Sequence, residues 1–179
     1  MRSAIENIET RVTKLKVWFE ENPLEHDYQI EPVSKGDFQR LETMGCPRDM
    51  LLVLQGIGNL RGWGNGGCAV MDWWLPCGIA TAVKDARCHY LEGVEPELFS
   101  NHNDLLVFGW NCSAEVYFYE TSSKPWRIVV CDGFGASLSE PPHDEMVTPW
   151  REDRFADFIS IVESEIDYHE GNARRRAIE

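Results

Sequence analysis

Three short apolar runs follow one another along the stretch Asp104–Gly133. They are Leu105–Trp110, Ala114–Tyr119 and Trp126–Cys131, each rich in aromatic or β-branched residues and bounded by turn residues. Runs of this length and composition are typical of strands, and the short junctions between them favour hairpin connections. The pattern therefore predicts an antiparallel meander of three strands.

The middle run also predicts which side chains share a face of the sheet. Successive side chains of a strand point to opposite faces, so Val116 and Phe118 lie together on one face. Glu115, Tyr117 and Tyr119 lie on the other face. We expect the first face to be core and the second to be amphipathic.

Helical periodicity marks the N-terminal part of the chain. Apolar residues three or four positions apart predict a first helix that packs by one face. Ser34 is placed to cap a second helix that ends at Gly45. Pro47 is placed to open a short third helix to Gln55, which is apolar nearly all round and should be buried. Residues 22–33 are expected to be an irregular connection. The apolar face of the first helix consists of Ile5, Ile8, Val12, Leu15 and Phe19.

Six glycines crowd the segment Gly56–Gly67, which predicts a loop that uses positive φ angles. This loop is either a flexible connection or a recognition loop that presents Arg61 and Trp63. It follows a helix and precedes a predicted strand, Cys68–Leu75, which is the reverse of the order in a dinucleotide-binding fold. Further along, Ile79–Lys84 fits either a short helix or an extended edge.

The C-terminal part is predicted to be a loop followed by a helix. The segment Phe134–Pro149 is rich in glycine, serine and proline, and Thr148 with Pro149 suits a helix start. The apolar face of this helix would consist of Phe155, Phe158, Ile159, Val162 and Ile166. Residues 169–179 lack periodicity and are predicted to be a disordered tail. Residues 1–168 then form one α+β domain, with a mainly antiparallel sheet, N-terminal helices and a C-terminal helix packed on the sheet.

Two parts of the chain together resemble a known family. The first is the strand ending in Phe108-Gly109-Trp110, followed by Pro125–Val130 and Asp132-Gly133. The second is the helix from Phe38 to Gly45 with Cys46-Pro47, the apolar helix Asp49–Gln55 and Gly56-Ile57-Gly58. These segments resemble the SUKH superfamily, a group of bacterial immunity proteins named partly for a fungal cell-wall-synthesis regulator. Cys46 stands where the family usually has leucine, and Gly56-Ile57-Gly58 matches its Asn-Gly-Gly only loosely. The resemblance implies a cytoplasmic immunity protein that neutralises a cognate toxin of a bacterial polymorphic toxin system by binding it.

The charge of the chain narrows its range of partners. Its 179 residues carry a net charge of −13, from 30 acidic and 17 basic side chains. Binding to nucleic acid rests on clusters of lysine and arginine, so direct binding of nucleic acid is not expected. No apolar run is long enough to span a membrane, and the segment MRSAIENIETRV lacks the apolar region of a signal peptide. We therefore expect a cytoplasmic protein whose cysteines stay reduced.

Patterns for catalysis and metal binding are weak in this sequence. No G-x-S-x-G elbow occurs, and Cys88-His89 with His102 would allow Cys–His catalysis only if the fold brought them together. His143-Asp144-Glu145 are consecutive, and consecutive residues seldom converge on one metal ion. We assign no catalytic residue, no metal ligand and no cofactor. A closed pocket holding a Cys–His or carboxylate pair would instead indicate an enzyme.

Aromatic and acidic residues gather on the predicted sheet and its loops. Aromatic side chains dominate binding energy at protein interfaces, and acidic neighbours suit a cationic partner. We predict a protein-binding surface made of Trp63, Trp73, Trp110, Glu115, Tyr117, Tyr119, Glu120, Trp126 and Asp132. The predicted function is neutralisation of a basic toxin, such as a nuclease, by a monomer or homodimer. The alternative is a regulatory or scaffolding interaction domain without a toxin partner.

Overall fold

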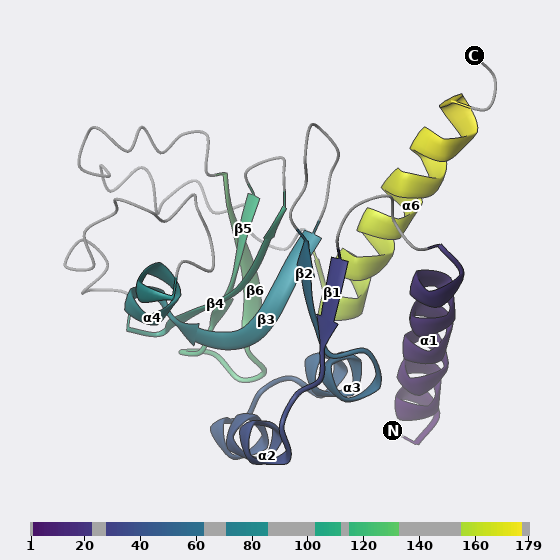
Figure 1. Cartoon of the computed structure of the whole chain (residues 1–179). Helices are drawn as coiled ribbons and strands as arrows, with labels where there is room; N and C mark the ends of the chain where they lie inside the picture. The colour runs from purple at the N-terminus through teal and green to yellow at the C-terminus, as the bar shows by residue number, and fades with distance from the viewer. Residues whose placement is uncertain are drawn as a thin grey trace, which may run out of the picture. The chain divides into compact units, whose positions relative to one another are not determined.

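The computed structural model describes residues 2–22, 28–62, 71–85, 103–111, 115–132 and 155–176. Its helices and antiparallel strand pairs confirm the predicted α+β class (Figure 1). The chain divides into two compact units, one made of Met1–Asp72 and Asp157–Glu179 and the other of Trp73–Ala156. That residues 1–168 behave as a single domain stays a prediction.

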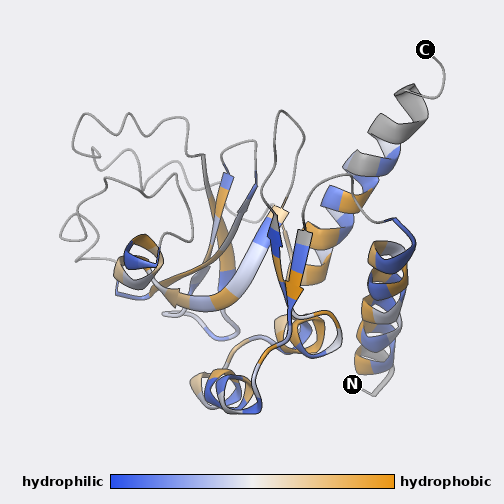
Figure 2. Ribbon diagram, viewed as in Figure 1, coloured by the Kyte–Doolittle hydropathy of each residue, from blue (hydrophilic) through white to orange (hydrophobic). Residues whose placement is uncertain are grey.

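The first unit is mainly helical. Its helices are α1 (Arg2–Glu21), α2 (Lys35–Met44), α3 (Arg48–Gly56) and α6 (Phe158–Arg176). The first of these buries Val12 and Leu15 and lies against α3 and α6, so it packs by one face as its periodicity predicted. Hydrophobic and hydrophilic residues alternate along this helix in Figure 2.

Helix α2 begins and ends as the sequence predicted. The Ser34 hydroxyl oxygen accepts a hydrogen bond from the backbone N–H of Asp37 at 3.1 Å, which satisfies one of the free amides of the first turn. Gly45 ends the helix with a φ of 88°, a conformation that favours glycine. The next backbone N–H, of Cys46, donates to the carbonyl of Leu41 at 3.0 Å. The backbone N–H of Gly45 donates to the carbonyl of Glu42 at 3.1 Å, and the two bonds together form a Schellman motif.

Helix α3 is the buried helix that its composition predicted. Residues 49–54 are all buried, and Met50 and Val53 have no exposed surface. Gly56 allows α1 to come close, because a Cβ at this position would lie 2.9 Å from Val12 Cγ1. The absence of a side chain at Gly56 therefore helps α3 to pack against α1.

Two short strands lie where the sequence predicted a connection and a glycine-rich loop. Strands β1 (Tyr28–Glu31) and β2 (Asn59–Gly62) pair antiparallel, with Glu31 opposite Asn59. Gly58 leads into β2 with a φ of 104°, and a Cβ at this position would lie 2.5 Å from the carbonyl oxygen of Glu31. Only glycine fits both this φ angle and this close approach of two backbones. The irregular connection predicted over residues 22–33 is therefore wrong for its second half.

The second unit contains the predicted meander. Its elements are α4 (Ile79–Lys84), β4 (Leu105–Asn111), β5 (Glu115–Glu120), β6 (Arg127–Asp132) and, from Trp73 on, β3 (Met71–Gly78). Strands β3 to β6 follow chain order in the sheet, and β5 pairs antiparallel with β4 and with β6. Phe118 is opposite Val107 on one side and Val129 on the other. Residues 79–84 are helical, which decides between the two structures that the sequence allowed.

Both faces of β5 are buried. Val116 and Phe118 belong to an apolar cluster with Trp74 of β3 and Ile79 of α4. The opposite face carries Tyr117 and Tyr119, which are 0% and 1% exposed, and Phe108 stacks on Tyr119 with ring centroids 4.3 Å apart. The expectation of an amphipathic second face was therefore wrong. Aromatic stacking and burial make this face part of the core, although it carries two tyrosine hydroxyls.

The last helix differs from its predicted limits at both ends. α6 begins at Phe158, whereas the predicted start at Thr148 and Pro149 lies outside the described residues. Phe158, Ile159 and Val162 are buried, as their spacing predicted. The helix continues to Arg176, into the segment predicted as a disordered tail. Alanine and arginine are strong helix formers, so local propensity favours this continuation.

Candidate functional site

Most of the aromatic residues predicted to bind a partner lie inside the fold. Trp73, Tyr117, Tyr119 and Trp126 are buried, with exposed fractions of 8% or less. Trp110 is half-buried and packs against the apolar cluster of the second unit. Trp63 lies outside the described residues, and Asp132 is described only by its backbone, which pairs with Glu115. That these residues contact a partner stays a prediction, and in this arrangement the buried ones support the sheet from within.

Two of the three acidic residues of the predicted surface, Glu115 and Glu120, already have partners within the chain. Glu115 is buried, and its carboxylate accepts hydrogen bonds from Asn111 Nδ2 at 3.1 Å and from the Tyr117 hydroxyl at 3.2 Å. Asn111 Oδ1 accepts the backbone N–H of Glu115 at 3.0 Å, so this cluster closes the β4–β5 hairpin. Glu120 forms an ion pair with Arg127 on the neighbouring strand at 2.8 Å. Charge at these two positions is therefore used for cross-strand contacts.

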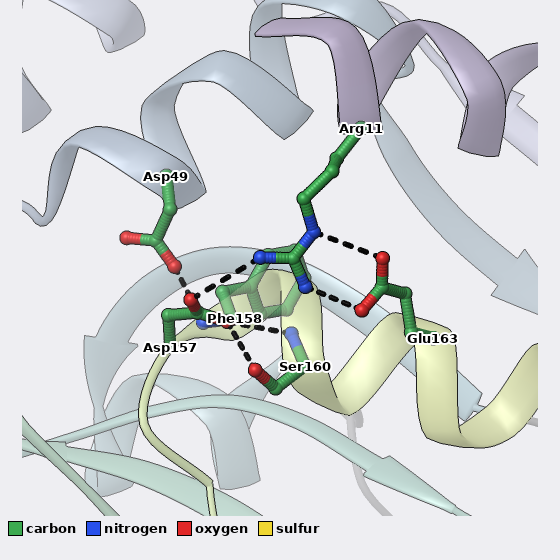
Figure 3. A network of polar contacts seen from close by, with 6 residues as sticks. All are labelled: Arg11, Asp49, Asp157, Phe158, Ser160 and Glu163. Carbon is green, nitrogen blue, oxygen red and sulfur yellow. Dashed lines mark hydrogen bonds and ion pairs between the residues drawn. The ribbon is translucent and has the colours of Figure 1, made fainter. Parts of the chain in front are cut away.

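A polar network joins the start of α6 to α1 and α3 (Figure 3). Arg11 of α1 forms a two-pronged ion pair with Glu163, in which Nε donates to Oε1 at 2.9 Å and Nη2 donates to Oε2. The third nitrogen of the same guanidinium, Nη1, lies 3.7 Å from Asp157 Oδ2. The other Asp157 oxygen accepts the backbone N–H of Ser160 at 2.6 Å, which is the geometry of a helix N-cap.

Asp49 of α3 completes this network from the buried side. Its Oδ2 accepts the backbone N–H of Phe158, the first residue of α6, although the two residues are 109 positions apart in sequence. Asp49 is 7% exposed, and burial raises the pKa of its carboxyl above the ordinary value, partly offset by hydrogen bonds from the backbone N–H groups of Phe158 and Met50. A carboxylate at the N-terminus of a helix also interacts favourably with the helix dipole. The network therefore fixes where α6 begins.

Cys46 is the buried neighbour of this network. Burial raises the pKa of its thiol to about 12, and the charge of Asp49 contributes in the same direction. A thiol with so high a pKa is almost entirely protonated at neutral pH, and the thiolate is the reactive form. Cys46 therefore acts as a small apolar side chain.

A surface pocket of about 320 Å³ lies in the first unit where β1 leads into α2. Its apolar lining consists of Pro32, Val33, Phe38, Leu54 and Ile57, and its polar lining includes Lys35 and Gln55. Gly58 also borders it, and a Cβ there would lie 3.4 Å from Ile30 Cγ2. Ile30 of β1 is 48% exposed, so an apolar surface extends from the strand into the pocket. Sequence reasoning missed this site because two separate segments build it, residues 32–38 and residues 54–58.

Within the described ranges, no three histidine, cysteine, aspartate or glutamate side chains are grouped so that they could hold a metal ion. Cys88, His89, His102 and the segment His143-Asp144-Glu145 lie outside those ranges. No helix in the described part of the chain is long and apolar enough to cross a membrane. Comparisons with protein families, with curated proteins and with solved structures found no match to this chain.

Proposed function

We propose that the chain is a non-enzymatic protein-binding domain that acts as a cytoplasmic immunity protein. Its target would be a basic toxin of a bacterial polymorphic toxin system, for example a nuclease. The resemblance of its segments to the SUKH superfamily supports this role. Inhibition would be steric, because the bound protein would cover the cleft through which the toxin reaches its substrate.

The observation that carries the proposal is the net charge of −13. A strongly acidic protein attracts a basic one over distances longer than direct contact, which raises the association rate and falls with ionic strength. The same charge opposes direct binding to the phosphates of nucleic acid. An inhibitor that carries the charge of a nucleic acid can therefore compete for the cleft of a nuclease.

A capture experiment tests this proposal. The tagged protein is incubated with lysate of its own organism at low and at high salt, and the bound proteins are identified by mass spectrometry. We expect one basic partner that is retained at low salt and released at high salt. Capture of no partner, or of an acidic housekeeping protein at both salt concentrations, would refute toxin neutralisation; the housekeeping protein would favour a regulatory domain.

Charge variants make this experiment specific. Glu6, Glu9, Glu20 and Glu21 are exposed residues of α1, and replacing all four by glutamine removes four negative charges without disturbing the core. This variant should lose the partner at a lower salt concentration than the wild type. The matched control replaces the exposed Lys14 and Lys16 of the same helix by glutamine, which makes the chain more acidic, and it should retain the partner at least as well.

A further inference from the structure

Strand β1 presents an open edge to solvent. Among the residues that the structure describes, β1 is hydrogen-bonded to β2 alone, and its residues Gln29, Ile30 and Glu31 are exposed. The backbone groups on the open edge of a strand are complementary to another extended segment, and adding a strand is a common way for proteins to bind peptides. In Figure 2 the arrow of β1 also carries hydrophobic colour near its tip.

The pocket lies at the carboxyl end of this strand. Pro32 and Val33, which follow β1 directly, form part of its wall, and α2 and α3 supply Phe38 and Leu54. Its volume of about 320 Å³ is at the lower end of the range for ligand pockets and is ample for one large apolar side chain. A peptide paired with β1 would therefore meet an apolar pocket at that end of the strand.

Lys35 gives this pocket a positive charge. It is exposed, and none of the described residues that line the pocket is acidic. The nearby acidic side chain of Asp37 is already occupied, since it accepts the Ser34 hydroxyl at 2.7 Å and lies 3.4 Å from Arg40. Within the described part of the chain Lys35 has no ion pair. An apolar pocket with a cation at its rim suits an apolar group that carries a carboxylate.

We propose that β1 and this pocket bind the C-terminal segment of the partner protein. One ligand fits the three features together: an extended main chain along β1, an apolar last side chain in the pocket and an α-carboxylate at Lys35. The pocket holds the last residue of the peptide and follows the carboxyl end of β1. The carboxyl ends of peptide and strand therefore lie together, and the peptide runs parallel to β1. The inference rests on the proposed function for the existence of a partner protein, and it adds the part of the partner that docks on the first unit.

A peptide experiment tests the inference without knowledge of the partner. The full chain is immobilised and offered a pool of random heptapeptides with free carboxyl ends, and the enriched sequences are determined. We expect enrichment of peptides with an apolar last residue, and about fivefold weaker binding when the best of them is made as its C-terminal amide. No enrichment, or equal binding of the acid and the amide, would overturn the inference.

Protein variants locate the binding at this pocket. Lys35→Glu should weaken the selected peptide at least about fivefold, whereas Lys16→Glu, the same charge change on α1, should leave its binding unchanged. Val33→Phe adds volume at the half-buried wall and should also weaken binding. Equal effects of Lys35→Glu and Lys16→Glu would contradict the site. If no peptide is enriched while the wild type still captures a basic partner from lysate, the docking inference fails and the proposed function stands.

Discussion

The sharpest structural prediction concerns Asp49, which joins α3 to the start of α6. Asp49→Ala removes the acceptor for the backbone N–H of Phe158, a residue with no exposed surface. A buried donor left without a partner costs about 1–3 kcal/mol, and loss of a helix cap costs about 0.5–2 kcal/mol. Both figures describe the same bond, so we expect the free energy of unfolding to fall by about 2 kcal/mol. Urea denaturation followed by tryptophan fluorescence measures this change.

Asp49→Asn separates the hydrogen bond from the charge. Asparagine keeps a carbonyl acceptor but cannot ionise, so this variant should be much more stable than Asp49→Ala at neutral pH. Burial raises the folded-state pKa of Asp49 above its ordinary value of 3.8, so the native state binds the proton more tightly than the unfolded state. The resulting stabilisation is present below pH 3.8 and is lost as the pH rises through the raised pKa.

The pH dependence of stability tests the reasoning about Asp49. The stability of Asp49→Asn relative to the wild type should increase as the pH rises from below 3.8 towards neutrality. The control is Glu42→Ala on the exposed side of α2, which should change stability by no more than about 0.5 kcal/mol. An Asp49→Ala variant as stable as this control, or an Asp49→Asn difference that falls with rising pH, would refute the reasoning.

Three further predictions follow from contacts in the first unit. Gly58→Ala should lower the free energy of unfolding by about 2 kcal/mol or more, because the new Cβ meets backbone at a φ of +104°. Gly36→Ala has space for its Cβ and should be neutral or stabilising, so equal denaturation midpoints of the two variants would contradict this prediction. A double-mutant cycle of Arg11→Ala and Glu163→Ala should give a coupling free energy of about 1 kcal/mol, which should shrink in about 1 M salt because both side chains are partly exposed. A coupling of zero would show that the ion pair contributes nothing to stability. Burial raises the pKa of the Cys46 thiol to about 12, so the native Cys46→Ala variant and the native wild type should show the same number of fast-reacting thiols at pH 8, counted with an aromatic disulfide reagent. A lower number in the variant would show that the Cys46 thiol is reactive.

Local signals made the meander and the N-terminal helices predictable. The apolar runs around Val107, Phe118 and Val129 are bounded by turn residues, and these three residues are neighbours across the sheet. Ser34 and Gly45 end α2 through contacts within a few residues, so the sequence pattern carries them directly. Such features depend on backbone chemistry within a few residues, so a short stretch of sequence is enough to predict them.

The remaining features depend on contacts between distant segments. Strands β1 and β2 have four residues each, and their pairing depends on the close backbone approach at Gly58. Asp49 and Phe158 are linked across 109 positions, which no periodicity reveals. Tyr117 and Tyr119 looked amphipathic because their hydroxyls suggested an exposed face, but stacking with Phe108 makes that face part of the core. The sequence pattern alone does not distinguish a strand that is buried on both faces from one that is buried on a single face when the second face is aromatic.

The most direct test of the central claim is growth of a bacterial host that expresses the captured basic partner. The partner is placed under an inducible promoter, with this chain supplied from a second plasmid, and growth is followed after induction. We predict that the partner alone stops growth, that the wild-type chain restores it, and that the variant lacking the four α1 glutamates restores it less well. A partner that does not affect growth, or growth arrest that the wild-type chain does not relieve, would contradict toxin neutralisation.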